Sequence, residues 1–177
     1  IYARPDSAAP EELLLTMAGE LRHRGPDGTG LYTDGRFGMT NNRLAIVDLE
    51  GGDQPLASED RRYWVMQNGE IYNYVELRAD LETLGRRFVT TSDTEVIAQA
   101  YAEWGPGCLD RMNGDFAFAV WDDRDKKLFM ARDRLGVKQD EIEALVRDID
   151  LRDGKLDGRL DQPVQVKRCE ACDRVNG

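Results

Sequence analysis

The chain has 177 residues, of which 41% are hydrophobic and 33% charged, and its formal net charge is -10 at pH 7. This size and composition suit a folded protein with one core and a small appendage. The negative charge argues against a nucleic-acid partner, because non-specific binding to phosphates needs a cationic surface. No apolar run is long enough to cross a membrane and the N-terminus does not read as a signal peptide. We therefore expect a cytoplasmic protein with no membrane partner.

The N-terminal part of the chain predicts one helix followed by several strands. Apolar residues at helical spacing after Pro10 predict a helix over residues 10–23. Extended segments at residues 30–33, 37–47 and 62–67 then predict strands, because turn-forming residues separate them.

Two helices are predicted in the middle of the chain. The segments 73–85 and 92–105 each begin with Asn or Ser, carry Glu three residues later and end at glycine. This is the spacing of a capping box followed by a glycine stop signal. Residues 86–90, between the two helices, read as a short strand.

Residues 115–122 and 126–133 are predicted to be two strands joined by a charged turn. Both alternating sets of residues in the first strand are apolar, so we expect it to be buried on both faces, between a second sheet and helices. The two sets are Phe116, Phe118 and Val120, and Ala117, Ala119 and Trp121. This pattern predicts an α+β fold in which stacked mixed sheets are flanked by helices.

A domain boundary is expected at Lys138, where the pattern of the sequence changes. Residues 1–138 form the predicted domain, and residues 139–177 form an unassigned tail. Within the tail, residues 139–150 fit one amphipathic helix. The remainder reads as irregular because it is polar and punctuated by glycine.

The cysteines and the single histidine form no recognisable site. Three cysteines, an odd number, agree with a reducing compartment. Cys108 reads as a small buried hydrophobe and His23 as a structural loop residue. Cys169 and Cys172 form a CxxC pair, but a zinc ribbon needs two more ligands, so the pair is half of a metal site or a chance spacing. No metal site is predicted.

The dipeptide Asn68-Gly69 follows a predicted strand, yet a helix comes after it, so it does not turn a hairpin. A side-chain amide and a backbone N–H are two donors that can point at one position, as in an oxyanion hole. The alternative is a loop pair in which glycine only supplies a positive φ, and the dipeptide alone favours that alternative.

Two charged residues complete the candidate site. Arg43 interrupts an apolar strand and can fork onto a carboxylate, although a structural salt bridge explains it as well. Asp93 lies in a predicted first helical turn, where the helix dipole already favours it, and it can also accept an ammonium group. Together, a carboxylate clamp, an ammonium acceptor and an oxyanion hole suit an α-amino acid whose side-chain carbonyl is attacked.

Six motifs, in order and in register, carry a resemblance to a known family. They are RHRGPDGTG, NRLAIVDLEGGDQPL, NGEIYNYVELR, TTSDTEVIAQAYAEWG, LDRMNGDFAFAVWD and ARDRLGVK. Residues 1–138 resemble the class II glutamine amidotransferase domain of glutamine-hydrolysing asparagine synthetases. The resemblance implies a four-layer αββα sandwich of the N-terminal-nucleophile hydrolase type. It also implies that L-glutamine is hydrolysed and that the ammonia amidates aspartate in asparagine biosynthesis.

The resemblance further implies roles for individual residues. By position, Asn68 and Gly69 correspond to the oxyanion hole. Arg43 corresponds to the clamp on the α-carboxylate of glutamine, and Asp93 with Glu70 to the contacts of its ammonium group.

The remaining expectations from the resemblance concern the pocket wall, the cofactors and the partner. The domain itself needs no cofactor, and ATP and Mg are expected only in the C-terminal synthetase domain that is its partner in the family. The segment expected to line the pocket through its backbone comprises Leu44, Ala45, Ile46 and Val47.

The sequence departs from the family pattern at both ends. The family nucleophile is an N-terminal cysteine that uses its own α-amino group as the base, whereas this sequence opens at Ile1 and none of its three cysteines is N-terminal. The later strands of the family are replaced after Lys138, so we expect an incomplete sandwich. On its own this chain is expected to be inactive. A non-catalytic glutamine-binding remnant and a domain for another acceptor stay open, as does a homodimer.

Overall fold

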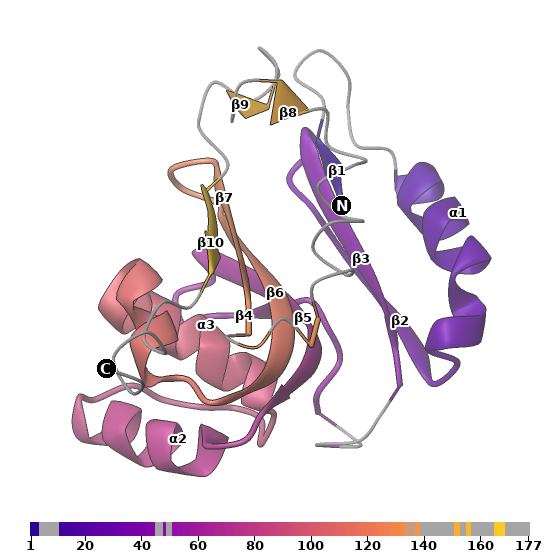
Figure 1. Cartoon of the computed structure of the whole chain (residues 1–177). Coiled ribbons are helices and arrows are strands. Elements are labelled where there is room, and N and C mark those ends of the chain that lie inside the picture. The colour runs from indigo at the N-terminus through magenta and orange to yellow at the C-terminus, as the bar shows by residue number, and fades with distance from the viewer. Residues whose placement is uncertain are drawn as a thin grey trace.

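The computed structural model describes residues 1, 11–44, 48, 51–133, 135 and 137–138, and the backbone of 2–3, 151–152, 155–156 and 165–168. Two sheets lie face to face at its centre (Figure 1). The smaller sheet has the strand order β1-β3-β2, with β1 Tyr2–Ala3, β2 Gly28–Thr33 and β3 Phe37–Arg43. The larger sheet has the order β10-β7-β6-β5-β4, with β4 Leu56–Ala57, β5 Tyr63–Ile71, β6 Gly114–Asp122, β7 Lys127–Arg132 and β10 Gln165–Arg168.

Helices cover the outer face of each sheet. The helix α1 (Glu11–Glu20) packs on β2 and β3, and α3 (Asp93–Trp104) packs on β5 with α2 (Tyr74–Thr83) beside it (Figure 1). The order helix, sheet, sheet, helices is the predicted αββα sandwich, which is confirmed. Two 3₁₀ helices, Arg22–Arg24 and Gly105–Arg111, follow α1 and α3.

The strand β6 is buried on both faces, as its sequence predicts. Phe116, Phe118 and Val120 belong to the core between the larger sheet and its helices. The alternate set, Ala117, Ala119 and Trp121, belongs to the core between the sheets. There the rings of Phe37 and Trp121 stack with their centroids 3.9 Å apart. Each fully buried aromatic side chain contributes about 2–3 kcal/mol to folding, so β6 joins the two halves of the molecule.

The predicted strand at 62–67 is longer than expected. It continues as β5 to Ile71, which pairs with Gly114 of β6. The Asn68-Gly69 dipeptide therefore lies inside a strand and not after one, because β6 offers it a pairing partner along its whole length. The strand predicted at 37–47 is described only to Arg43, since residues 45–47 lie outside the described part of the chain.

The prediction of a strand at residues 86–90 is wrong. The backbone N–H groups of Val89 and Thr90 donate to the carboxylate of Glu95, at 2.9 and 2.7 Å, and not to a neighbouring strand. Ser92 does cap α3, because its hydroxyl accepts a hydrogen bond from the N–H of Thr94. Glu95 thus holds the preceding loop and does not complete the predicted capping box.

The second predicted capping box, at the start of α2, is also wrong. The side chain of Asn73 accepts a hydrogen bond from the N–H of Asn113 and donates one to the carbonyl of Arg111. It makes no capping bond to its own helix. Asn73 therefore ties α2 to the start of β6, a long-range contact that the local sequence could not reveal.

The tail contains more regular structure than predicted. Residues 165–168 form β10, which pairs in parallel with the free edge of β7, and β8 (Leu151–Arg152) pairs with β9 (Lys155–Leu156). An open edge strand presents unpaired N–H and C=O groups, and β10 satisfies those of β7. The predicted helix at 139–150 lies outside the described residues, as do the two cysteines of the CxxC pair, Cys169 and Cys172.

Other predictions concern single residues. Cys108 is buried in the second 3₁₀ helix, as predicted, and His23 is exposed in the first. No helix in the described residues is long and apolar enough to cross a membrane. Nor do those residues contain three or more His, Cys, Asp or Glu side chains placed to hold a metal ion.

An ion pair fastens the turn between β6 and β7. Arg62 donates to both carboxylate oxygens of Asp122, at 2.9 and 2.6 Å, and to Asp125 at 2.9 Å. Asp122 also accepts the N–H groups of Arg124 and Asp125. Burial raises the pKa of the Asp122 carboxyl, but the hydrogen bonds from Arg62 and from the Asp125 N–H outweigh burial and hold that pKa below its ordinary value.

We predict that Asp122→Asn lowers the free energy of unfolding by about 1–3 kcal/mol at pH 7, because Arg62 loses the buried charge and one of its two acceptor oxygens. The pKa of Asp122 is lower in the folded state than its ordinary 3.8. Its contribution is therefore complete above that value and disappears as the pH falls through the folded pKa. Urea denaturation at several pH values measures this, with Asp125→Asn as the more exposed control. A difference between wild type and Asp122→Asn that is the same at pH 7 and at pH 2 would contradict the prediction.

Candidate active site

A cavity of about 510 Å³ opens where the end of β3, the middle of β5 and the first turn of α3 meet. Every residue of the predicted site that the structure describes lines this cavity. The remaining three, Ala45, Ile46 and Val47, lie outside the described residues. Those that line it are Arg43, Leu44, Asn68, Gly69, Glu70 and Asp93.

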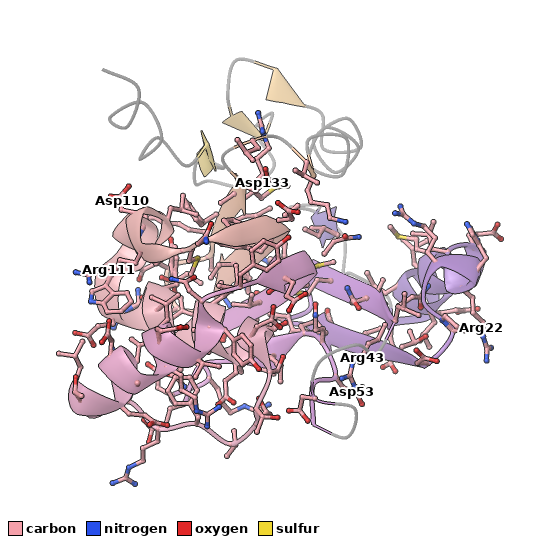
Figure 2. All side chains as sticks on the ribbon, turned by 60° about the horizontal axis from the view of Figure 1, so that its bottom comes forward. Arg22, Arg43, Asp53, Asp110, Arg111 and Asp133 are labelled. Atoms are coloured by element: carbon pink, nitrogen blue, oxygen red, sulfur yellow. The ribbon has the colours of Figure 1, made fainter. Side chains whose placement is uncertain are left out.

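Arg43 ends β3 and is only 8% exposed. Its Nη1 donates to Asp53 Oδ1 at 3.0 Å, and its Nη2 donates to the backbone carbonyl of Asp48. Figure 2 shows Arg43 and Asp53 side by side. A Cβ atom on Gly52 would stand 2.6 Å from Nη2, so the turn at 51–53 closes directly onto the guanidinium. Arg43 is therefore both a structural ion-pair partner and part of the cavity wall.

Asp48 holds the turn beside Arg43. Its carboxylate accepts the N–H of Gly51 at 2.9 Å and that of Thr91 at 2.8 Å. Burial raises the pKa of Asp48, but these two N–H groups outweigh burial and hold the pKa below its usual value. Because Thr91 directly precedes the N-cap of α3, Asp48 connects the Arg43 side of the cavity to the Asp93 side.

Asp93, in the first turn of α3, is 5% exposed. Its Oδ2 accepts the backbone N–H of Ile71 at 3.0 Å and the side-chain amide of Gln67 at 2.7 Å. Within the described part of the chain, its Oδ1 makes no hydrogen bond. The carboxylate is thus fixed by β5 through one oxygen while its side chain borders the cavity, which the helix dipole alone does not explain.

The alternation of β5 sends its side chains to opposite faces. Val65 and Ile71 pack toward the helices, whereas Trp64 and Met66 pack between the sheets. By the same alternation, Asn68 and Glu70 face the other sheet and the cavity. The Asn68 amide makes no hydrogen bond with any described residue, so its two donors are free for a ligand.

Gly69 has the positive φ that the sequence left open as an explanation, and it also lies in the wall of the cavity. Its φ is +122°, a conformation that L side chains rarely adopt. A Cβ atom there would also overlap the carbonyl oxygen of Asp115 in β6. The glycine is therefore required for the close approach of the two strands, and its backbone still borders the cavity.

Sequence reasoning missed three residues of the cavity wall, Gln54, Gln67 and Thr94, which form a polar network. The N–H of Gln67 donates to Gln54 Oε1 at 2.7 Å, and Gln54 Nε2 donates to Thr94 Oγ1 at 3.0 Å. The only signal in the sequence is Gln67 itself, a polar side chain on the face of β5 that also carries Val65 and Ile71.

The rim of the cavity carries two further anchored segments. The hydroxyl of Tyr72 donates to Asp115 Oδ2 at 2.7 Å, and that hydrogen bond raises the pKa of Tyr72. The buried Asp133 accepts the N–H groups of Val137 and Lys138, and these two hydrogen bonds hold Val137 and Lys138 at the cavity wall.

Comparison with protein families and curated proteins gives consistent matches. The model of the family described as the glutamine amidotransferase domain matches residues 1–139. The chain is 45% identical over 132 residues to asparagine synthetase (glutamine-hydrolyzing) 1 of Bacillus subtilis (strain 168), covering 75% of this chain and 21% of that protein. It is 46% identical over 132 residues to the corresponding synthetase 1 of Arabidopsis thaliana, covering 75% of this chain and 22% of that protein. The chain thus spans about a fifth of the length of these relatives.

Solved structures share the fold. Glutamine phosphoribosylpyrophosphate amidotransferase from B. subtilis, complexed with ADP and GMP, superposes with a TM-score of 0.55 at 22% identity, covering 69% of this chain and 34% of that one. A structure titled as the allosteric regulatory enzyme of purine biosynthesis gives a TM-score of 0.55 at 20% identity over the same shares of the two chains. These similarities support the sandwich architecture.

We predict that Gly69→Ala lowers the free energy of unfolding by about 2–4 kcal/mol, because an alanine meets both the unfavourable φ and the backbone of β6. Gly85→Ala is the matched control, since Gly85 has a φ of +89° but nothing within 4 Å of its Cβ position. That variant should lose only about 1–2 kcal/mol. Urea denaturation of both proteins checks this, and equal losses would show that the approach of β6 at Gly69 does not matter.

Proposed function

Because the chain belongs to the glutamine amidotransferase domain family, we propose that its cavity binds L-glutamine and that the protein hydrolyses the side-chain amide of this ligand. The observation that carries the proposal is the meeting of three complementary groups at one cavity. These are a guanidinium on Arg43, a carboxylate on Asp93 and an unpaired amide on Asn68. Each matches one polar end of glutamine.

Arg43 is proposed to bind the α-carboxylate of glutamine. Its present acceptor for Nη1 is Asp53, whose side chain is 78% exposed. An exposed carboxylate loses little when it returns to water, so a ligand carboxylate can take its place at low cost. Asp93 and Glu70 are proposed to take the α-ammonium group, and the backbone from Leu44 to Val47 to line the same end of the pocket.

Asn68 and Gly69 are proposed to form the oxyanion hole. When a nucleophile attacks the side-chain carbonyl carbon, the carbonyl oxygen gains negative charge, which two donors can stabilise. Breaking the C–N bond then releases ammonia, and water hydrolyses the acyl intermediate to glutamate.

The nucleophile is proposed to be a cysteine on a segment that continues β1 upstream of Ile1. β1 pairs with β3 in antiparallel register, with Tyr2 opposite Gly38 and Ala3 opposite Phe37. Residues that continue β1 backwards in this register would run along β3 toward Arg43 and the cavity. The described cysteine, Cys108, is buried in the core beyond the larger sheet and does not line the cavity.

The wider setting is proposed from the relatives. We infer a domain over residues 1–138 that passes ammonia to a synthetase domain, where ATP and Mg serve the amidation of aspartate. The domain itself would need no cofactor. A cytoplasmic protein without a nucleic-acid or membrane partner agrees with the net charge of -10 and with the reducing environment that the cysteines indicate. A homodimer is compatible with this proposal.

Titration with L-glutamine by calorimetry tests the binding site. We predict that Arg43→Ala weakens binding more than about 30-fold, because the ligand carboxylate loses a buried charged partner. The matched control is Asp53→Asn, which breaks the same ion pair but keeps the arginine, and it should bind as tightly as wild type or more tightly. Equal heats from wild type and Arg43→Ala would remove Arg43 from the site.

Turnover tests the oxyanion hole separately from binding. In the protein that carries the proposed N-terminal cysteine, Asn68→Ala should lower kcat for glutamine hydrolysis by roughly 10²–10³-fold, because the amide acts mainly in the transition state. The dissociation constant of glutamine should change far less. A fall in affinity without a fall in kcat would assign Asn68 to substrate binding alone.

A further inference from the structure

Gln67 buries an amide group whose hydrogen bonds go to the groups of the proposed site. Its side chain lies on the helix-facing side of β5 and the residue is 6% exposed. Nε2 donates to Asp93 Oδ2 at 2.7 Å and to the carbonyl of Gly69 at 2.9 Å. A single amide group therefore joins the carboxylate on α3 to the backbone of the glycine on β5.

The orientation of this amide is determined by its partners. Both groups that face Nε2 are acceptors, a carboxylate and a carbonyl, so a flipped amide would place oxygen against oxygen. On the other side, Oε1 lies 3.5 Å from the hydroxyl of Thr94, which Gln54 also contacts. The backbone N–H of Gln67 is held by Gln54 as well.

An apolar residue could occupy the same position in the fold. Val65 and Ile71 lie on the same face of β5 and are fully buried. Burying an amide instead is favourable only if its hydrogen bonds are made, because an unsatisfied one costs about 1–3 kcal/mol. The partners of this amide, Asp93 and Gly69, both line the cavity. The hydrogen bonds of Gln67 therefore stabilise the wall of the cavity.

We propose that Gln67 is a positioning residue that prepares the site for the α-ammonium group of the ligand, a role that rests on the proposed function. Gln67 and the N–H of Ile71 both occupy Asp93 Oδ2, which leaves Oδ1 as the oxygen that meets an ammonium group. The bond to the Gly69 carbonyl also adds to the pairing with β6 in holding the backbone of Gly69. Gln67 thus couples the ammonium end of the site to the oxyanion end.

The test compares two ligands on three proteins by calorimetry. The ligands are L-glutamine and 4-carbamoylbutanoate, which is the same molecule without the α-amino group. In wild type, glutamine should bind more tightly than the analogue. In Gln67→Leu, the affinity for glutamine should fall about tenfold while that for the analogue changes little, because only the charge-assisted contact through Asp93 is misplaced.

The third protein, Gln99→Leu, is the matched control. Gln99 is also a buried amide, but its Nε2 donates to the carbonyl of Arg87 and it does not line the cavity. This variant should keep the full discrimination between the two ligands. If Gln67→Leu does not fold, Gln67→Met keeps the length of the side chain, removes the donors without adding a charge beside Asp93 and should lose the same discrimination.

The outcomes separate the two proposals. If wild type binds glutamine and the variants weaken both ligands in parallel, or weaken neither, Gln67 has no positioning role while the proposed function stands. If wild type binds neither ligand, the proposed function fails and takes the role of Gln67 with it. A loss of discrimination confined to the Gln67 variants supports the proposal.

Discussion

The antiparallel register between β5 and β6 places most of the groups at the candidate site. It runs without interruption from Tyr63 opposite Asp122 to Ile71 opposite Gly114. Because β6 is buried on both faces, β5 cannot shift by one residue without sending every side chain to the opposite face. The register therefore sends Asn68 into the cavity, turns Gln67 toward α3 and demands a glycine at position 69.

The second constraint is a group of hydrogen bonds between β5 and the first turn of α3, which we call the polar seam. Asp93 is anchored to β5 by two hydrogen bonds, and the network of Gln54, Gln67 and Thr94 extends the same contact. Charge-assisted bonds between a carboxylate and N–H donors are shorter and stronger than neutral ones. The seam thus fixes the distance between the Asp93 carboxylate and the Asn68 amide before any ligand arrives, which reduces the ordering cost of binding.

The sequence predicted the layers of the fold better than it predicted helix caps and short strands. The doubly apolar pattern of residues 115–122 was enough to predict a sandwich, since only a strand between two layers can bury both sets. Capping at Asn73 and the strand at 86–90 were wrong for a common reason. In both, a side chain or backbone group finds its partner in a different segment, Asn113 in one case and Glu95 in the other.

The candidate site shows the same division. The meeting of Arg43, Asn68 and Asp93 at one cavity was predictable because the family motifs supplied the register between them. The contact of Gln67 with Asp93 was not predictable, because a single glutamine gives no periodic signal and the contact depends on where α3 packs. The ion pair between Arg43 and Asp53 also depends on the turn at 51–53, which closes on the guanidinium only in the folded chain.

Recognition and chemistry have different structural origins in this fold. The groups proposed to recognise glutamine come from β3, β5 and α3, and the hydrogen bonds that hold Arg43 and Asp93 lie within the described domain. Recognition should accordingly be a property of this domain alone. Hydrolysis, as proposed, needs one more group, the nucleophile, and a segment that continued β1 backwards in its register with β3 would run toward Arg43.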